Sequence, residues 1–245
     1  PVVPIYSTFL QRAYDNIIHD SLLQNLPILY CMDRAGVVGP DGPTHHGVFD
    51  ISFMRSLPGM IVTAPKDGNE LRNLMATALG SNNNFSIRYP KAHCDFDLEL
   101  EPVLLEIGKW EILHKGTSVV ILAVGSMVAM IMDNKQALYK ELGYLPTIVN
   151  ARFIKPLDSE LLISLCESFD SIITIEEGSL AGGFGSAVGD FLHDNSLNNR
   201  LCRLGIPDQF IQHGTRDELL HEIGLTYNNV IRIIKEGVSE EIYEY

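Results

Sequence analysis

A loop from residue 33 to residue 49 gathers most of the side chains in this sequence that could do chemistry. It carries one arginine, Arg34, one internal carboxylate, Asp41, and two adjacent histidines, His45 and His46. Glycines and prolines alternate with these polar residues: Gly36, Gly39, Pro40, Gly42, Pro43 and Gly47. Glycine permits left-handed turns and proline stiffens the chain, so the polar side chains are held on a defined frame. The loop is therefore predicted to be a site rather than part of a core.

Three roles are open for the two histidines on these grounds. Adjacent loop histidines point in different directions, so only one is expected to face a given ligand. A zinc site needs further ligands at workable spacing, and Asp41 is the only one nearby. Acid-base or hydrogen-bonding chemistry, with Asp41 and His45 cooperating, is the favoured interpretation. The third possibility is a loop histidine that caps turns.

Two arginines, Arg34 and Arg88, each follow an apolar run that predicts a parallel strand. Their forked guanidinium groups suit phosphate or carboxylate, so together they predict an anion pocket, with solvated surface arginines as the alternative. Tyr6 and Phe9 flank the start of the first predicted helix, where a phosphate or an aromatic ring could dock. The alternative for these two residues is a place in the core.

A second glycine run, Gly182-Gly183-Phe184-Gly185, lacks the spacing and the acidic partner of a dinucleotide-binding turn. The run predicts close packing of a helix on a strand, and a subunit contact is one place where such packing is expected. Glu176 and Glu177 are expected to form an acidic pair at the end of that strand.

Composition narrows the class of protein. The chain has 245 residues, of which 46% are hydrophobic and 20% charged, as in a soluble α/β protein of two domains. No apolar run approaches the roughly 20 residues of a membrane helix, so no membrane partner is expected. A net charge of -13, without a basic patch, argues against nucleic acid as a partner. The four widely spaced cysteines are predicted to be reduced core residues in a cytosol-like compartment.

Alternating strand and helix patterns predict two tandem α/β domains, 1–103 and 104–245, joined by a linker at 92–102. Strands are expected at 2–5, 28–32, 60–64, 85–89, 118–124, 147–150, 172–175 and 201–204. The order in the first domain predicts a parallel sheet. Helices are expected from about residue 9 to 22, at 51–57, after a cap at Asp67, from about 126 to 143, after Asp158, up to Leu192, after Thr215 and at 228–236. A capping box of Thr8 with Gln11 is predicted for the first helix, and Leu79 is placed on the buried face of the helix after Asp67.

Several motifs, in order along essentially the whole chain, resemble the 1-deoxy-D-xylulose-5-phosphate synthases, a branch of the transketolase-like thiamine-diphosphate enzymes. They are Tyr6-Ser7-Thr8-Phe9-Leu10-Gln11-Arg12-Ala13-Tyr14-Asp15, Asp33-Arg34-Ala35-Gly36, Gly39-x-Asp41-Gly42-x-Thr44-His45-x-Gly47-x-Phe49-Asp50, Arg88-Tyr89-Pro90, Arg152-Phe153-Ile154-Lys155-Pro156-Leu157-Asp158 and Gly205-Ile206-Pro207-Asp208. The resemblance implies a partial pyrimidine-binding domain followed by a transketolase C-terminal-like domain. It also implies a cytoplasmic homodimer, or a plastid location in a eukaryote.

The implied reaction condenses pyruvate with D-glyceraldehyde 3-phosphate and releases carbon dioxide, for isoprenoid-precursor, thiamine and pyridoxal biosynthesis. The cofactors implied are thiamine diphosphate and Mg²⁺. By position, Phe9 should stack on the aminopyrimidine, with Arg12 in a supporting role. Tyr6, Arg34 and Arg88 should hold the substrate phosphate. Asp41 and His45 should contact the pyruvate-derived centre as the catalytic residues.

The sequence departs from the family in what it lacks. The family's diphosphate-binding and magnesium-binding domain, and its activating glutamate, have no counterpart and should lie before Pro1, so no metal ligand is expected here. The piece alone is expected to be inactive. Lys91-Ala92 also stand where the family often has Arg-Gly.

Two rival functions are open on the same residues. The first is the beta subunit of a 2-oxo acid dehydrogenase, which the segment Asp33-Arg34-Ala35-Gly36 matches poorly. The second is a non-catalytic dimerisation or regulatory module.

Overall fold

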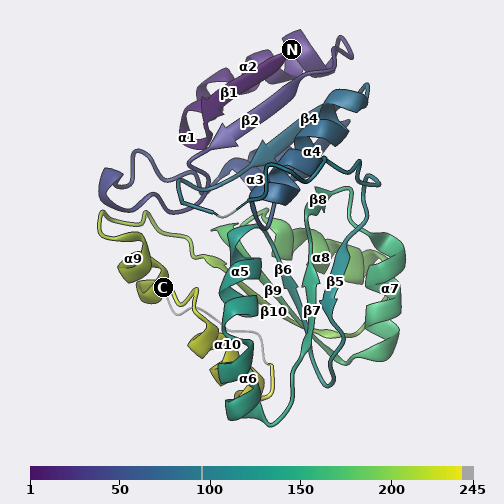
Figure 1. Ribbon diagram of the computed structural model, residues 1–245, viewed down its shortest axis with the longest axis vertical. Helices are drawn as coiled ribbons and strands as arrows, with labels where there is room; N and C mark the ends of the chain where they lie inside the picture. Colours follow the sequence, from purple (N-terminus) through teal and green to yellow (C-terminus); the bar gives the residue numbers. More distant parts are fainter. Residues whose placement is uncertain (95, 239–245) are drawn as a thin grey trace.

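Two five-stranded sheets, one above the other in Figure 1, form the frame of the molecule. The computed structural model describes residues 1–94 and 96–238. The strand orders are β1-β2-β4-β3-β8 in the first sheet and β10-β9-β6-β7-β5 in the second. Helices flank both sheets, which confirms the predicted α/β fold with two units in tandem.

In the first sheet, four strands are parallel: β1 (Val2–Tyr6), β2 (Leu29–Asp33), β4 (Asn84–Arg88) and β3 (Met60–Thr63). Tyr6 is in register with Asp33, and Met32 with Arg88. The residues after these strands therefore meet at the carboxyl edge of the sheet, where ligands of open α/β sheets bind. The fifth strand, β8 (Phe153–Lys155), is antiparallel to β3 and was not predicted. β8 lies in the first sheet although its residues belong to the second predicted domain, 104–245. The domain boundary after residue 103 therefore stays a prediction.

The first predicted helix is broken into segments. These are α1 (Ser7–Leu10), η1 (Gln11–Ala13), α2 (Tyr14–Asn16) and η2 (Ile17–Leu22), the last wound as a π-helix. The capping box predicted for Thr8 and Gln11 is wrong, because Tyr6 is the N-cap and makes no side-chain cap bond. Thr8 lies inside the helix, and its hydroxyl donates to the carbonyl of Thr44 at 3.3 Å. This contact ties the start of the helix to the loop.

The other helical segments of this unit are η3 (Gly39–Asp41), α3 (Asp50–Arg55) and α4 (Gly68–Gly80). The cap predicted for α4 is confirmed, since the carboxylate of Asp67 accepts from the backbone N–H of Glu70 at 2.8 Å. The buried place predicted for Leu79 is wrong, because its side chain is 63% exposed. Leu74 and Ala78, four residues apart, form the buried stripe. Leu79 is rotated about 100° from Ala78 and so leaves that stripe.

The second sheet contains β5 (Glu111–His114), β6 (Val120–Ala123), β7 (Thr147–Asn150), β9 (Ser171–Ser179) and β10 (Arg200–Ile206). All neighbours are parallel except β5, which was not predicted and runs antiparallel to β7. The helices are α5 (Ser126–Asp133), α6 (Lys135–Leu142), α7 (Ser159–Ser168), α8 (Phe184–Asp194), α9 (Arg216–Glu222) and α10 (Tyr227–Glu236). The single helix predicted near 126–143 is two helices, because Asn134 leaves helical geometry between them. The caps predicted at Asp158 and at Thr215 with Glu218 are confirmed.

The two faces of the second sheet have different neighbours. Along β6, Val120 and Leu122 belong to a core that includes α7, α8 and the first sheet, whereas Ile121 and Ala123 pack with α5 and α10. This alternation is the two-residue period of a strand that is buried on both faces. One hydrophobic core thus runs from the first unit into the second.

Three of the four cysteines, Cys31, Cys166 and Cys202, are buried as predicted. The core position predicted for Cys94 is wrong, because Cys94 lies exposed in the segment after β4. Within residues 1–94 and 96–238, no helix combines the length and apolar character needed to cross a membrane.

Candidate active site

An aromatic stack occupies the carboxyl edge of the first sheet. The rings of Tyr6 and Phe9 are stacked, with centroids 5.3 Å apart and planes 10° from parallel. His45, from the loop, meets Phe9 edge-on at 5.5 Å. All three side chains are half-buried, so the stack is held by packing and still presents surface to a ligand.

Two guanidinium groups flank this stack. Arg34 lies over the ring of Tyr6 at 3.8 Å and pairs with Asp33 at 2.6 Å. Arg12 lies 5.3 Å from the centroid of Phe9. Arg34 has a left-handed backbone, with φ of 54°, which turns the chain out of β2 and aims the side chain back over the sheet edge. The structure therefore brings five of the seven predicted site residues into one array: Tyr6, Phe9, Arg12, Arg34 and His45.

The ring of His45 is oriented by its neighbour. Its Nδ1 lies 2.9 Å from the hydroxyl of Thr44, whose carbonyl accepts from Thr8. With Nδ1 engaged, Nε2 is the nitrogen left to exchange a proton with a ligand. Asp41 lies farther along the loop, is exposed, and pairs with Lys91 at 3.3 Å. In the described part of the chain, the ion pair of Asp41 is thus with Lys91 rather than with His45.

Arg88 is placed differently from Arg34. Its side chain is 5% exposed, and its Nε donates to both carboxylate oxygens of the fully buried Asp50, at 3.1 and 2.9 Å. Its Nη2 donates to the carbonyls of Gly47, at 3.4 Å, and Glu177, at 2.9 Å. Arg88 thus joins the end of the loop to β9 of the second unit, and a phosphate shared with Arg34 stays a prediction.

His46 points away from the array and into the protein. The backbone N–H of Val38 donates to its Nδ1 at 3.0 Å, so the ring proton is on Nε2, which donates to the carbonyl of Gln212 at 3.1 Å. His46 is 4% exposed and fastens the loop to the segment before α9.

Glu177, at the end of β9, also reaches the loop from the second unit. Its carboxylate accepts from the backbone N–H of Val37 and pairs with Arg216, the first residue of α9. From the sequence, Glu177 was predicted only as part of an acidic pair, Asp50 appeared only as the last residue of a family motif without an assigned role, and Arg216 was not singled out. Such partners are far apart in the chain, and only the fold brings them together.

The glycine run packs closely on β9, as predicted. The carboxylate of Glu176 accepts from the backbone N–H groups of Phe184, at 2.8 Å, and Gly185, at 2.7 Å, at the start of α8. A Cβ on Gly183 would come within 2.5 Å of that carboxylate. Burial raises the pKa of Glu176 to about 7, although these hydrogen bonds and nearby arginines oppose the shift.

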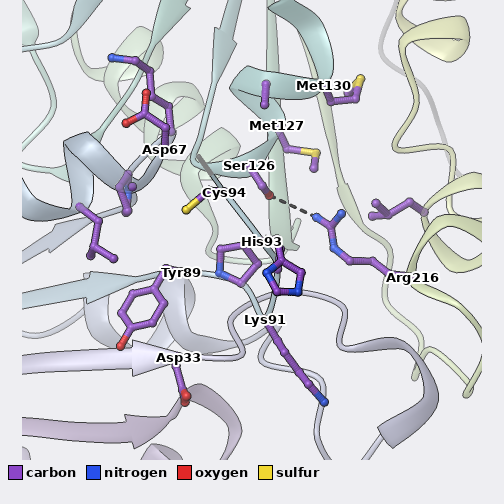
Figure 2. A pocket seen from close by; sticks show the side chains of 18 of the residues that line it. Asp33, Asp67, Tyr89, Lys91, His93, Cys94, Ser126, Met127, Met130 and Arg216 are labelled. Carbon is purple, nitrogen blue, oxygen red and sulfur yellow. Dashed lines mark hydrogen bonds between the residues drawn. The ribbon is translucent and has the colours of Figure 1, made fainter. Parts of the chain in front are cut away.

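A cavity of about 630 Å³ lies between the carboxyl edge of the first sheet and helices α5 and α9 (Figure 2). Its labelled lining residues are Asp33, Asp67, Tyr89, Lys91, His93, Cys94, Ser126, Met127, Met130 and Arg216. Asp33, Lys91 and Arg216 are the ion-pair partners of Arg34, Asp41 and Glu177. Burial raises the pKa of Tyr89 to about 12, so its phenol stays neutral at physiological pH. The cavity therefore borders the residues that hold the loop in place.

No three histidine, cysteine or carboxylate side chains of residues 1–94 and 96–238 are grouped so that they could hold a metal ion.

Comparison with known proteins gives two family matches. The model described as "Transketolase, pyrimidine binding domain" matches residues 1–95, and "Transketolase, C-terminal domain" matches residues 108–230, about half of the chain. Among curated relatives, the 1-deoxy-D-xylulose-5-phosphate synthase of Aquifex aeolicus is 45% identical over 98% of this chain and 38% of its own length. Synthase 1 of Geobacter sulfurreducens is 48% identical over 92% of this chain and 36% of its own length. The chain thus spans less than two-fifths of these relatives.

Solved structures agree with these matches. The structure "Split gene transketolase, inactive beta4 tetramer" superposes with a TM-score of 0.85 at 27% identity, over 97% of this chain and 76% of that one. Transketolase from Campylobacter jejuni has a TM-score of 0.73 at 18% identity, over 96% of this chain and 35% of its own, and shows the shared fold.

Proposed function

The chain belongs to the transketolase family, and from this premise we propose that it is the part of a 1-deoxy-D-xylulose-5-phosphate synthase that carries the pyrimidine-binding and C-terminal domains. The observation that carries the proposal is the 45–48% identity to curated synthases over nearly the whole chain. The reaction is the condensation of pyruvate with D-glyceraldehyde 3-phosphate, with loss of carbon dioxide. Its product would serve isoprenoid-precursor, thiamine and pyridoxal biosynthesis.

Thiamine diphosphate, when bound, would supply the carbon nucleophile and the sink for the electron pair released with carbon dioxide. The aromatic stack fits such a group, because Phe9 is half-buried and has a flat face braced by Tyr6. In the proposal, Phe9 holds the aminopyrimidine and Arg12 supports that contact from above its ring. Mg²⁺ and the diphosphate belong to the family's diphosphate-binding domain.

The phosphate of the aldehyde substrate is assigned to Tyr6, Arg34 and Arg88. Arg34 supports this role best, because its guanidinium lies at the sheet edge and its pair with Asp33 is partly open to solvent. Tyr6 would orient the guanidinium through the cation–π contact and offer its hydroxyl. Arg88 is engaged by Asp50, so its share is expected to be a remaining N–H directed to the phosphate.

His45 is the residue that we assign to proton transfer, through Nε2, while Thr44 fixes its ring at Nδ1. Its edge-on contact with Phe9 supports this assignment, because Phe9 is the residue proposed to hold the aminopyrimidine. Asp41 is assigned to the pyruvate-derived centre, and its pair with Lys91 would orient that carboxylate before a substrate arrives.

The 245-residue chain by itself is expected to be inactive, because its proposed residues bind only the ring end of the cofactor. The similar split-gene transketolase, described as an inactive beta4 tetramer, favours this expectation. We further propose that the complete enzyme is a homodimer in the cytoplasm, or in a plastid if the source is eukaryotic.

The test compares this chain with a complete synthase that carries the same residues. Each is given pyruvate, D-glyceraldehyde 3-phosphate, thiamine diphosphate and Mg²⁺, and the 1-deoxy-D-xylulose 5-phosphate formed is measured by mass spectrometry. Product is expected only from the complete protein. Turnover by the chain alone would refute the incomplete-site argument, and a complete protein without turnover would favour a non-catalytic module.

A further inference from the structure

Glu177 crosses between the two units and ends against the backbone of the loop. Its side chain is 1% exposed. One carboxylate oxygen accepts from the N–H of Val37 at 2.7 Å, and the other accepts from the hydroxyl of Ser126 at 2.9 Å. Arg216 neutralises the buried charge through a two-point contact. The carboxylate is therefore fixed from the second unit by α5 and α9.

The loop is shaped to receive this carboxylate. Gly36 has φ of +80°, and a Cβ there would lie 2.5 Å from the carboxylate of Glu177. Gly36 and Gly47 exchange two backbone hydrogen bonds of 2.8 Å, which close the loop at its base. The contact between Glu177 and Val37 thus acts beside the point where the loop is closed.

The closed loop carries the side chains that matter for the proposed reaction. Asp41 and His45 lie between Gly36 and Gly47, and Arg34 lies two residues before Gly36. A shift of the loop base would move His45 relative to Phe9, and a misplacement of about 1 Å is enough to lower a rate about 100-fold.

We propose that Glu177 is a positioning residue, which sets the place of Asp41 and His45 by holding the backbone of Val37 from the second unit. The proposal rests on the function proposed above. Glu177 itself touches neither substrate nor cofactor, and it acts through the loop.

The chain offers a matched control in Glu70. This carboxylate on α4 is 2% exposed and also joins the two units, accepting from Asn150 at 2.8 Å and from Arg152 at 3.3 Å. Its contacts are with neither the loop nor the aromatic stack. Glu70→Gln therefore weakens the contact between the units without altering the support of the loop.

The first experiment uses hydrogen exchange of the 245-residue chain, followed by mass spectrometry of peptides covering residues 36–48. Glu177→Gln is expected to raise exchange in this segment about tenfold or more. The side-chain NH2 of the glutamine would face the N–H donors of Arg216, so a charge-assisted hydrogen bond is replaced by two opposed donors. Glu70→Gln should leave the segment as in the wild type. Arg216→Lys, which keeps the charge but loses the fork, is a milder second variant in case Glu177→Gln does not fold.

The proposal would be overturned if Glu177→Gln and Arg216→Lys both fold and their residues 36–48 exchange at the wild-type rate.

The second experiment measures turnover in the complete synthase, normalised to the folded fraction. Glu177→Gln should lower kcat about tenfold or more, and Glu70→Gln less than about twofold. Faster loop exchange with unchanged kcat would also overturn the positioning role. If the wild-type synthase makes no product, the proposed function fails, whereas the exchange result still decides whether Glu177 holds the loop.

Discussion

Replacing Arg88 should lower the free energy of unfolding of the chain far more than replacing Arg34, although both arginines are assigned to the same substrate phosphate. Arg88 is 5% exposed and its partner Asp50 is fully buried. Among residues 1–94 and 96–238, Arg88→Ala leaves that carboxylate with the N–H of Ile51 as its remaining hydrogen-bond partner, and it removes the Arg88 donor from the carbonyl of Glu177. Breaking a buried ion pair on one side costs about 3–5 kcal/mol.

Arg34→Ala removes much less stabilisation. Its pair with Asp33 is partly exposed, with 23% and 29% of the two side chains open to solvent, and such pairs contribute about 1 kcal/mol or less. The cation–π contact with Tyr6 adds about 0.5–1 kcal/mol. The expected loss is therefore at most about 2 kcal/mol, and the two variants should be clearly resolved.

Urea unfolding of the 245-residue chain, followed by far-ultraviolet circular dichroism at pH 7, measures both losses. The double variant Arg88→Ala with Asp50→Ala should be less destabilised than the sum of its single variants, because no carboxylate is left buried alone. If Arg88→Ala unfolds within about 0.5 kcal/mol of the wild type, the ion pair does not hold the loop and the reasoning is refuted. If it is as unstable as expected, kinetic effects of Arg88→Ala in the complete synthase have to be measured on folded protein before they are attributed to the phosphate.

Two further substitutions test the site, and a third tests the buried carboxylate of Glu176. His45→Ala should lower kcat of the complete synthase about 100-fold or more in steady-state assays, since it removes the proposed proton carrier, and an effect on KM alone would contradict that role. Arg34→Ala should lower kcat/KM for D-glyceraldehyde 3-phosphate by about 10- to 100-fold, for a lost charged hydrogen bond, and leave the KM for pyruvate unchanged; equal effects on both substrates would argue against phosphate binding. Burial raises the pKa of Glu176 to about 7, so the folded chain holds a proton that the unfolded chain releases above its ordinary value of 4.5. Stability should therefore fall from about pH 4.5 to 7, by at most about 1.4 kcal/mol per pH unit, and level off above that window. Glu176→Gln should remove this component, and a difference in unfolding free energy from the wild type that stays constant between pH 5 and 8 would contradict the shift.

The central strands could be predicted because a short run of consecutive residues is enough to indicate their burial. β6 is a continuous apolar run and β9 contains the nearly apolar run Ile172-Ile173-Thr174-Ile175, and a run of that kind between turn residues indicates a strand covered on both faces. The caps at Asp67, Asp158 and Thr215 were equally local, since each side chain bonds a backbone N–H three residues ahead. The cap predicted at Thr8 followed the same rule but is wrong, because the Thr8 hydroxyl donates to the carbonyl of Thr44 instead.

The supports of the site were not predictable in this way. Asp50 neutralises Arg88 across 38 residues, and Glu177 meets Val37 across 140. No periodicity or spacing links such pairs, because they depend on how the two units pack. β8 escaped prediction for a related reason: three residues are too few to show a strand pattern, and the neighbouring strand that stabilises β8 lies in the other unit.

The loop contacts both units, which explains why its motifs could be recognised in the sequence but its geometry could not be predicted from it. The second unit binds its backbone at two points near the loop ends: Glu177 accepts from Val37, and the N–H of Ser179 donates to the carbonyl of Val48 at 2.8 Å. The side chains assigned to chemistry face the first unit, where His45 meets Phe9 and Asp41 meets Lys91. The residue types reveal the chemistry, whereas the distances between them are set from β9. Arg88 donates both to Asp50 and to the carbonyl of Glu177, so Glu177 contacts the loop base through its carboxylate and the buried ion pair through its carbonyl. A change on β9 should therefore reach the site by both routes.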